Sequence, residues 1–195
     1  MWNRPTLYYE ISGLGSTRWC WLGLGLLTLA CGVARAESRE YQIKAAFLVN
    51  FMQFVTWPSS AFTNADAPFC VGVLGDDPFG EALDQTVQGE TVNHHKIVIQ
   101  RARRIEDCKD CQMIFVSRSE EKNLPVILAK LDSGPVLTVS ETRDFARRGG
   151  IINFYLEGNK VRFEINPSVA QRDKLKISAQ LLSLGKIVEP AEGGH

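Results

Sequence analysis

The sequence predicts an α/β protein: a single domain with a mixed, mostly parallel β-sheet flanked by helices, ending in a β-hairpin followed by a helix. Short apolar runs alternate with helical patterns between residues 69 and 140, which is typical of parallel strands joined by crossover helices. The first run, Phe69 to Leu74, is apolar throughout, as expected of a strand covered on both faces. Two later runs meet at Gly158-Asn159, a pair suited to a two-residue hairpin turn.

The first predicted element is a helix from Tyr41 to Val55. Its apolar residues recur at helical spacing and form a broad buried face. Trp57-Pro58 ends the helix, because the residue before a proline is displaced from helical geometry. After the strand at 69–74 we expect a helix that begins at Pro78, with Asp77 as its capping residue.

Further strands are predicted at 96–99, 113–117 and 136–140, with a helix at 120–131 before the last of them. The two runs of the hairpin are residues 151–156 and 160–166. Asn166-Pro167 is expected to cap a single C-terminal helix, whose apolar positions include Leu175, Leu181, Leu182 and Leu184.

The N-terminus predicts a cleavable secretory signal over residues 1–36. A leader with two arginines precedes an apolar run at 19–33, and the small-x-small site Ala34-Arg35-Ala36 follows. The run is shorter than the roughly 20 residues that span a bilayer, which disfavours a retained anchor helix. Lipid attachment at Cys31 is a further alternative, because the preceding residues loosely resemble a lipobox. We therefore expect residues 37–195 to form one domain that works in the periplasm.

Composition and motifs exclude several classes of function. Without the predicted signal the chain has 19 basic and 21 acidic residues and no basic block, so a nucleic-acid or anionic-membrane surface is not indicated. The sequence contains no nucleophile elbow and no His-Glu-x-x-His pattern. We expect a protein that is not an enzyme and that needs no metal or cofactor.

Three cysteines follow the signal, and an exported protein is expected to form a disulfide. Three pairings are possible. Cys70 opens the first strand and Cys111 precedes the third; these strands are neighbours in a flavodoxin-like sheet, so Cys70–Cys111 is the preferred bridge. Cys108 would then be a spare thiol. A redox pair of Cys108 and Cys111, or a zinc site from both with His94 and His95, are the alternatives.

Loops after the first and third strands form a candidate ligand crevice. The segment Gly75 to Gly80 has the glycine spacing of a phosphate loop, yet it carries Asp76 and Asp77 and lacks the lysine of that motif. In an open α/β sheet these loops meet where ligands bind, and Ser117 ends the third strand. We expect Asp76, Asp77 and Ser117 to line a crevice for a small ligand or cation. Helix capping by Asp77 is the alternative.

Several runs occur in order along the chain from about residue 41 to 188. They include Tyr41-Gln42-Ile43-Lys44-Ala45-Ala46-Phe47-Leu48, Val73-Leu74-Gly75-Asp76-Asp77-Pro78-Phe79-Gly80, Gly149-Gly150-Ile151-Ile152-Asn153-Phe154 and Lys160-Val161-Arg162-Phe163-Glu164-Ile165-Asn166. Together these runs resemble the YfiR-like family of bacterial periplasmic proteins. The resemblance implies a non-enzymatic regulator that binds the periplasmic part of an inner-membrane diguanylate cyclase, so that cyclic di-GMP and biofilm formation fall.

The resemblance also implies a tendency to form a homodimer and a disulfide between the cysteines that match Cys70 and Cys111. The best-known family member has a second bridge in its later half. This chain has no cysteine after Cys111, so redox control through a second bridge is not expected.

The predicted helix is the expected contact with a partner or a second copy of the chain. Phe47, Phe51, Phe54 and Trp57 give it more large apolar side chains than one sheet face readily covers. The alternative is that the C-terminal helix covers this face completely. A second class of function also stays open, namely a periplasmic protein that binds a small ligand in the crevice at Gly75 to Gly80.

Overall fold

A computed structural model describes residues 39–132 and 134–190. The predicted signal, its cleavage site and Cys31 lie outside the described residues. The strands are β1 (Val55–Thr56), β2 (Phe69–Leu74), β3 (Thr91–Val92), β4 (His95–Ala102), β5 (Met113–Val116), β6 (Leu137–Ser140), β7 (Ile152–Glu157), β8 (Lys160–Ile165), β9 (Lys176–Ile177) and β10 (Lys186–Ile187).

The first helix covers residues 39–54. It is followed by the α-helices α2 (Glu81–Val87), α3 (Leu124–Leu131), α4 (Pro167–Arg172) and α5 (Ala179–Leu184), and by the short 3-10 helices η1 (Ser59–Ala61), η2 (Ile105–Asp107) and η3 (Arg118–Asn123). Among the described residues, no helix combines the length and apolar character that a membrane crossing needs.

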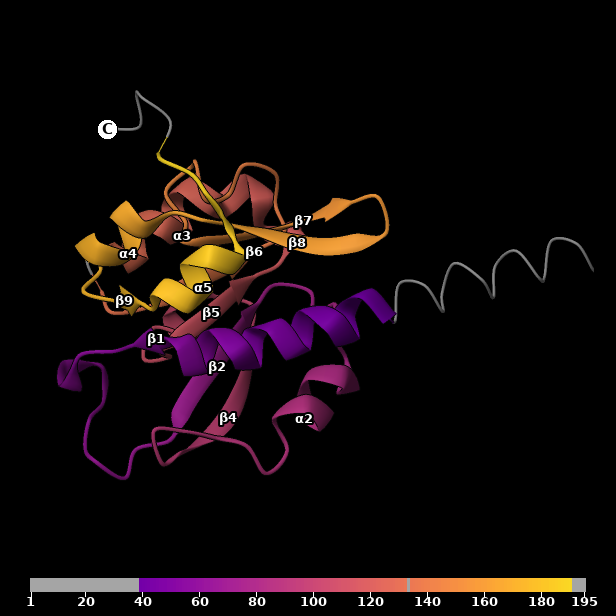
Figure 1. The fold of residues 1–195 in the computed structure, drawn as a ribbon. Coiled ribbons are helices and arrows are strands. Elements are labelled where there is room, and N and C mark those ends of the chain that lie inside the picture. Colours follow the sequence, from indigo (N-terminus) through magenta and orange to yellow (C-terminus); the bar gives the residue numbers. More distant parts are fainter. Residues whose placement is uncertain (1–38, 133, 191–195) are drawn as a thin grey trace, which may run out of the picture. The chain divides into compact units, whose positions relative to one another are not determined.

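The main sheet has the strand order β10-β8-β7-β6-β5-β2-β4-β3 (Figure 1). Strands β4, β2, β5, β6 and β7 are parallel to one another, whereas β7 and β8 form an antiparallel hairpin across Gly158-Asn159. All described residues belong to one unit of the chain. The predicted fold class, a mixed and mostly parallel sheet with flanking helices and a late hairpin, is confirmed.

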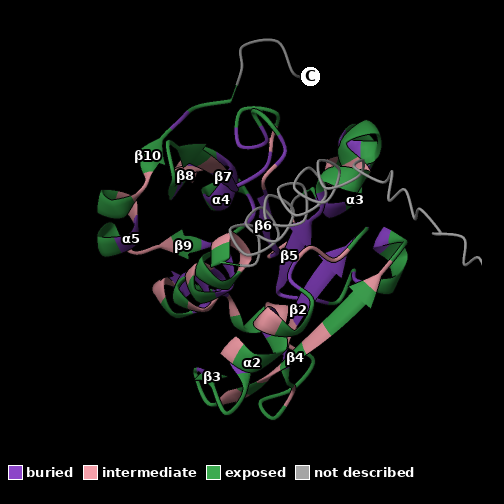
Figure 2. Ribbon diagram, turned by 90° about the vertical axis from the view of Figure 1, so that its right-hand side faces the viewer, coloured by how far each residue is buried: buried purple, intermediate pink, exposed green. Residues whose placement is uncertain are grey.

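Helices cover both faces of the sheet. One face packs against helix 39–54, α2, α4 and α5 and forms the larger apolar core, and the other face packs against α3 and η2. In Figure 1 the indigo helix 39–54 crosses the sheet in front of β2 and β5. The central strands β2 and β5 are accordingly buried, while β4, which only the two-residue strand β3 flanks on its outer side, alternates between partly buried and exposed residues (Figure 2).

The helix after β2 begins later than the sequence predicts. We expected it to start at Pro78 with Asp77 as its cap, but α2 starts at Glu81 and its N-cap, Gly80, makes no side-chain bond. Asp77 instead closes a turn, because its Oδ1 accepts the backbone N–H of Phe79 at 2.8 Å. The carboxylate therefore has the predicted local role of binding a backbone amide, but outside the helix.

The region after the hairpin contains two short helices, α4 and α5, where the sequence predicted one. Asn166 caps α4 as expected, since its side chain accepts the N–H of Val169 at 3.2 Å. Lys174 then adopts a left-handed conformation with φ 62°, and Leu175 N–H bonds back to Ala170 C=O at 2.8 Å. This pattern is a helix-terminating motif, so the chain leaves helical geometry before the leucines at 181–184.

Candidate functional site

The loops that follow β2 and β5, which we call the switch-point loops (residues 75–77 and 117–120), lie side by side as the sequence predicts. Their strands are neighbours in the sheet, and the chain goes to β4 on one side of β2 and to β5 on the other. Asp76 forms an ion pair with Arg103, and Asp77 pairs with Arg101 at 2.7 Å. Ser117 is buried and its hydroxyl caps η3. All three predicted residues therefore already have partners within the chain.

Gly75 explains why little room is left between the switch-point loops. Its φ is 93°, and a Cβ at this position would lie 2.4 Å from Ser119 Oγ and 2.9 Å from Glu120 Cγ. The same Ser119 hydroxyl accepts the backbone N–H of Asp76 at 2.9 Å. The η3 helix thus fills the position that a ligand would need. A ligand crevice here stays a prediction, and this geometry does not favour it.

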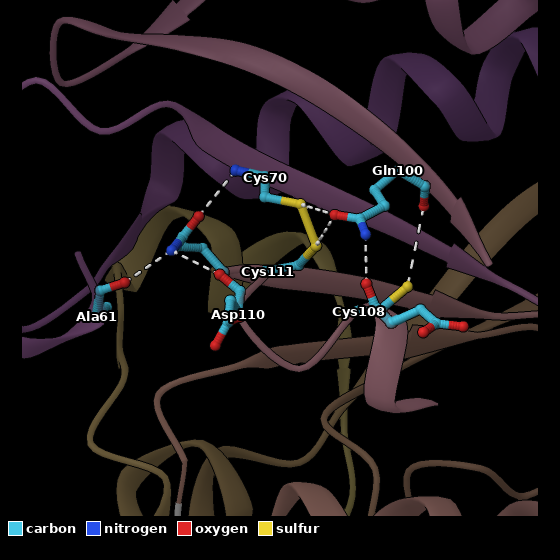
Figure 3. The surroundings of a disulfide bond; sticks show 8 residues. Ala61, Cys70, Gln100, Cys108, Asp110 and Cys111 are labelled. Atoms are coloured by element: carbon cyan, nitrogen blue, oxygen red, sulfur yellow. Dashed lines mark hydrogen bonds between the residues drawn. A yellow bond between two sulfur atoms is a disulfide. The ribbon is translucent and has the colours of Figure 1, made fainter. Parts of the chain in front are cut away.

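The opposite, amino-terminal edge of the same strands carries the disulfide. Cys70 and Cys111 are bonded with their Cα atoms 4.4 Å apart, which confirms the preferred pairing (Figure 3). Gln112 fixes the surroundings: its Oε1 accepts the Cys70 N–H at 2.7 Å, and its Nε2 donates to Ala61 C=O at 2.7 Å. The Gln100 side chain lies against the sulfur atoms, 3.6 Å from Cys70 Sγ. The bond is part of a satisfied polar network.

Cys108 is the free thiol that the preferred pairing leaves. It is buried among η2, β2 and α3, and burial, aided by the nearby Asp107 carboxylate, raises its pKa to about 11. A thiol with this pKa is a poor nucleophile at neutral pH, which disfavours the redox alternative. The zinc alternative also lacks support, because no cluster of three metal-ligating side chains occurs within residues 39–132 and 134–190. His95 stacks on Phe62 with ring centroids 4.2 Å apart.

The four aromatic residues expected at a partner face divide into two groups. Phe51 is 0% exposed and packs on Phe154 and Phe163 at centroid distances of 5.6 and 5.0 Å. Trp57 is also buried, and its indole N–H donates to Gln112 C=O at 3.0 Å. These two side chains belong to the core. Phe47 and Phe54 are partly buried, so their contact with a partner stays a prediction.

The exposed side of helix 39–54 has an unusual composition. From residue 41 to residue 56 the only ionisable cation or carboxylate is Lys44, and Lys44 is buried. The exposed positions are instead filled by Gln42, Ile43, Ala46, Asn50 and Gln53. A solvated helix normally carries charges on its outer face, whereas the centre of a protein interface is depleted of them. We call this surface the uncharged helix face.

A cluster of buried charges lies at the start of the same helix. Lys44 is 2% exposed and forms ion pairs with Glu40, one turn earlier, and with Glu141, just after β6. Tyr41 donates its hydroxyl to Glu141, with O–O distances of 3.0 and 3.2 Å, and its ring lies 4.5 Å from Lys44 Nζ. Burial and the Glu141 carboxylate raise the pKa of Tyr41 well above its usual range, so the phenol stays protonated and donates.

Glu40, Lys44 and Glu141 of this cluster form the inner wall of a pocket of about 480 Å³, which we call the Lys44 pocket, and Tyr41 lies behind that wall. The pocket lies beyond the carboxyl ends of β5 and β6 and is bounded by helix 39–54 and by strands β7, β8 and β10. Phe154, Tyr155 and Leu156 line it from β7, and Arg118 and Arg143 lie on it from the loops. This pocket was not predicted from the sequence. A lysine at 44 looks like an ordinary helix residue, and its second partner is 97 positions away.

The comparison with known proteins agrees with the sequence motifs. The DUF4154 family model, described as YfiR/HmsC-like, matches residues 41–186, which include helix 39–54 from its third residue, every strand from β1 to β9 and all the helices that follow. No curated protein matches the chain. The matched segment also contains both halves of the disulfide, the uncharged helix face and nearly all of the Lys44 pocket.

Proposed function

Because this chain belongs to the YfiR/HmsC-like family, we propose that it is a periplasmic negative regulator of a membrane diguanylate cyclase. In this proposal it binds the periplasmic portion of the cyclase and restrains cyclic di-GMP synthesis, which lowers biofilm formation. The family match over residues 41–186 carries the proposal. Members of this family are regulators rather than enzymes, and we propose the same for this chain.

Binding without chemistry needs a surface, and the uncharged helix face supports the proposal in this respect. Ile43, near the amino-terminal end of this face, is 40% exposed, and the partly buried rings of Phe47 and Phe54 lie on the same side of the helix. An outer face with amides, alanine and apolar side chains is inexpensive to desolvate, because no charged group loses its hydration. We propose that the cyclase docks here, or that a second copy of the chain does so before the cyclase displaces it.

The two exposed glutamines Gln53 and Gln85 allow a matched test, since both lie on helices and only Gln53 lies on the uncharged helix face. We expect Gln53→Lys to reduce in-cell crosslinking to a membrane cyclase at least tenfold, because a lysine ammonium would be desolvated at the interface. The concentration of cyclic di-GMP should rise in the same variant, because the cyclase is no longer restrained. Gln85→Lys should change neither quantity.

The experiment also separates the proposals. Equal effects of the two substitutions would remove the helix as the docking surface. Unchanged cyclic di-GMP after deletion of the gene, with no cyclase captured, would overturn the regulatory function itself. Phe51 is unsuitable for this test, because Phe51→Glu would place a carboxylate in the core and unfold the protein.

A further inference from the structure

We propose that the Lys44 pocket binds a positively charged amine or guanidinium group carried on an apolar stem. This site goes beyond the proposed function, because it needs no cyclase. Three features of the described residues carry it: the net charge of the inner wall, an unused acceptor on that wall, and an apolar side to hold the stem.

The inner wall carries one net negative charge. Glu40 and Glu141 are both paired with the single ammonium of Lys44, and Tyr41 stays neutral because burial and Glu141 raise its pKa. The Lys44 and Glu141 side chains are almost completely buried, so water screens this charge poorly. A second cation that enters the pocket offsets the excess charge, whereas an anion adds to it.

The other acidic groups of the pocket are already neutralised. Glu164 pairs with Lys186 at 3.1 Å, Asp144 with Arg143 at 3.4 Å and Glu121 with Arg148 at 3.9 Å. Arg118 and Arg143 are exposed, so water screens much of their charge, and the effect of Arg118 on the pKa of Tyr41 is smaller than that of Glu141. The attraction for a cation is therefore greatest at Glu40 and Glu141, on the inner wall.

Asn153 supplies an acceptor on the same wall. The residue is 4% exposed, and its Nδ2 donates to the carbonyls of Ser140, Thr142 and Phe154 at 3.3, 3.0 and 3.0 Å. These three acceptors fix the amide orientation. Among the described residues no donor bonds to its Oδ1, and Asn153 is one of the residues that line the pocket.

The ligand stem would lie along β7. Leu156 supplies the accessible apolar surface of the pocket, because it is 52% exposed, which is high for a leucine in a strand, whereas Phe154 is buried beneath it. Methylene groups next to an ammonium or guanidinium cover such surface while the charged end reaches a polar site. A free alkylamine has this chemistry, and so does a lysine or arginine side chain of a partner protein.

Hexylammonium and hexanoate make a matched pair of probes, because they share a chain length and differ in the sign of the charge. In an NMR titration of the purified protein, we expect hexylammonium to shift the Asn153 side-chain amide and the Leu156 backbone amide. Hexanoate should bind at least tenfold more weakly. Glu40→Gln removes one carboxylate while Lys44 keeps Glu141, and we expect it to weaken hexylammonium binding roughly tenfold.

Glu157→Gln is the control, because Glu157 is exposed, pairs with Arg162 and does not line the pocket. The proposal is overturned if hexanoate binds as tightly as hexylammonium, if neither binds, or if Glu157→Gln matches the effect of Glu40→Gln. Adding hexylammonium to the in-cell crosslinking experiment shows where the bound cation comes from. Loss of the crosslink to the cyclase supports a basic side chain of that partner, and an unchanged crosslink supports a free amine. The titration itself uses no partner, so its failure leaves the regulatory function standing.

Discussion

The carboxyl edge of the sheet holds two regions that differ in how their charges are satisfied. At the switch-point loops, Asp76 and Asp77 pair with Arg103 and Arg101, whose side chains are exposed, and Gly75 lets η3 pack directly on the loop after β2. In the Lys44 pocket, one buried lysine is shared by two carboxylates and an open space of about 480 Å³ remains beside them. The first region is closed by short-range contacts, and the second is open.

This difference shows that a location at the carboxyl edge of an α/β sheet is not sufficient to form a binding site. The topological rule points to the loops between β2 and β5, where the strand order reverses. Here that location is filled from within the chain. The open space lies further along the edge, where β7 and β8 extend past β6 and helix 39–54 begins. The part of the carboxyl edge that stays accessible to a ligand is therefore the part that neighbouring loops of the chain do not fill.

The largest expected effect concerns Lys44. In the variant Lys44→Met, the Glu40 and Glu141 carboxylates lose their shared cation while Glu141 stays buried, so we expect the free energy of unfolding to fall by about 3 kcal/mol. Urea denaturation at pH 7 measures this loss. A loss below about 1 kcal/mol, as for an exposed pair, would remove the contrast between the two regions.

A smaller effect is expected at Gly75. In Gly75→Ala the new Cβ would overlap Ser119 Oγ and the backbone would keep a positive φ, so we expect a destabilisation of about 2 kcal/mol. Gly89→Ala is the matched control: its φ is 79°, but no atom lies within 4 Å of the new Cβ, so only the strain of the positive φ remains, about 1 kcal/mol. Thermal unfolding of both variants compares them. Equal losses would mean that the switch-point loops are less tightly packed than the structure shows.

The smallest effect is expected for Arg101→Ala at the same loops. Arg101 pairs with Asp77 and with Asp84, and its hydrogen bond holds the pKa of Asp84 below the usual range. A carboxyl with a lowered pKa stabilises the folded state at neutral pH, and this contribution is lost as the pH falls through the lowered value. We expect a loss below about 1 kcal/mol at pH 7 that begins to shrink only as the pH falls below about 4. An effect as large as that of Lys44→Met would contradict the comparison.

Much of the fold could be predicted from the sequence because it is encoded locally. The continuous apolar run of β2, the glycine-first turn at Gly158 and the helical spacing of residues 41–55 each report on their own neighbourhood. The prediction of a single C-terminal helix was wrong, because Lys174 ends α4 in a left-handed conformation and a lysine does not signal a helix end as a glycine does. The helix start at Glu81 was missed because Asp77 binds an amide in a turn as readily as in a cap.

The candidate sites were harder to predict because they depend on distant residues. The width of the apolar stripe on helix 39–54 did not reveal that Phe51 faces the hairpin while Ile43 faces outward. Glu141 and Asn153 come close to Lys44 only after β6, β7 and the helix have packed together. The disulfide was the exception, since the strand neighbours could be inferred and the cysteines lie at their starts.

The Cys70–Cys111 bond also bears on the order of events during folding. In the reduced chain, β2 and β5 must find each other across 41 positions, and closing a loop of that length costs roughly 3 kcal/mol of chain entropy. Once the disulfide has formed, it holds the starts of β2 and β5 next to each other before the sheet forms. Their parallel pairing, which is intrinsically slow because it is non-local, then behaves as a short-range contact. After oxidation, the pairing of β2 with β5 can therefore begin at the amino ends of the two strands and proceed residue by residue.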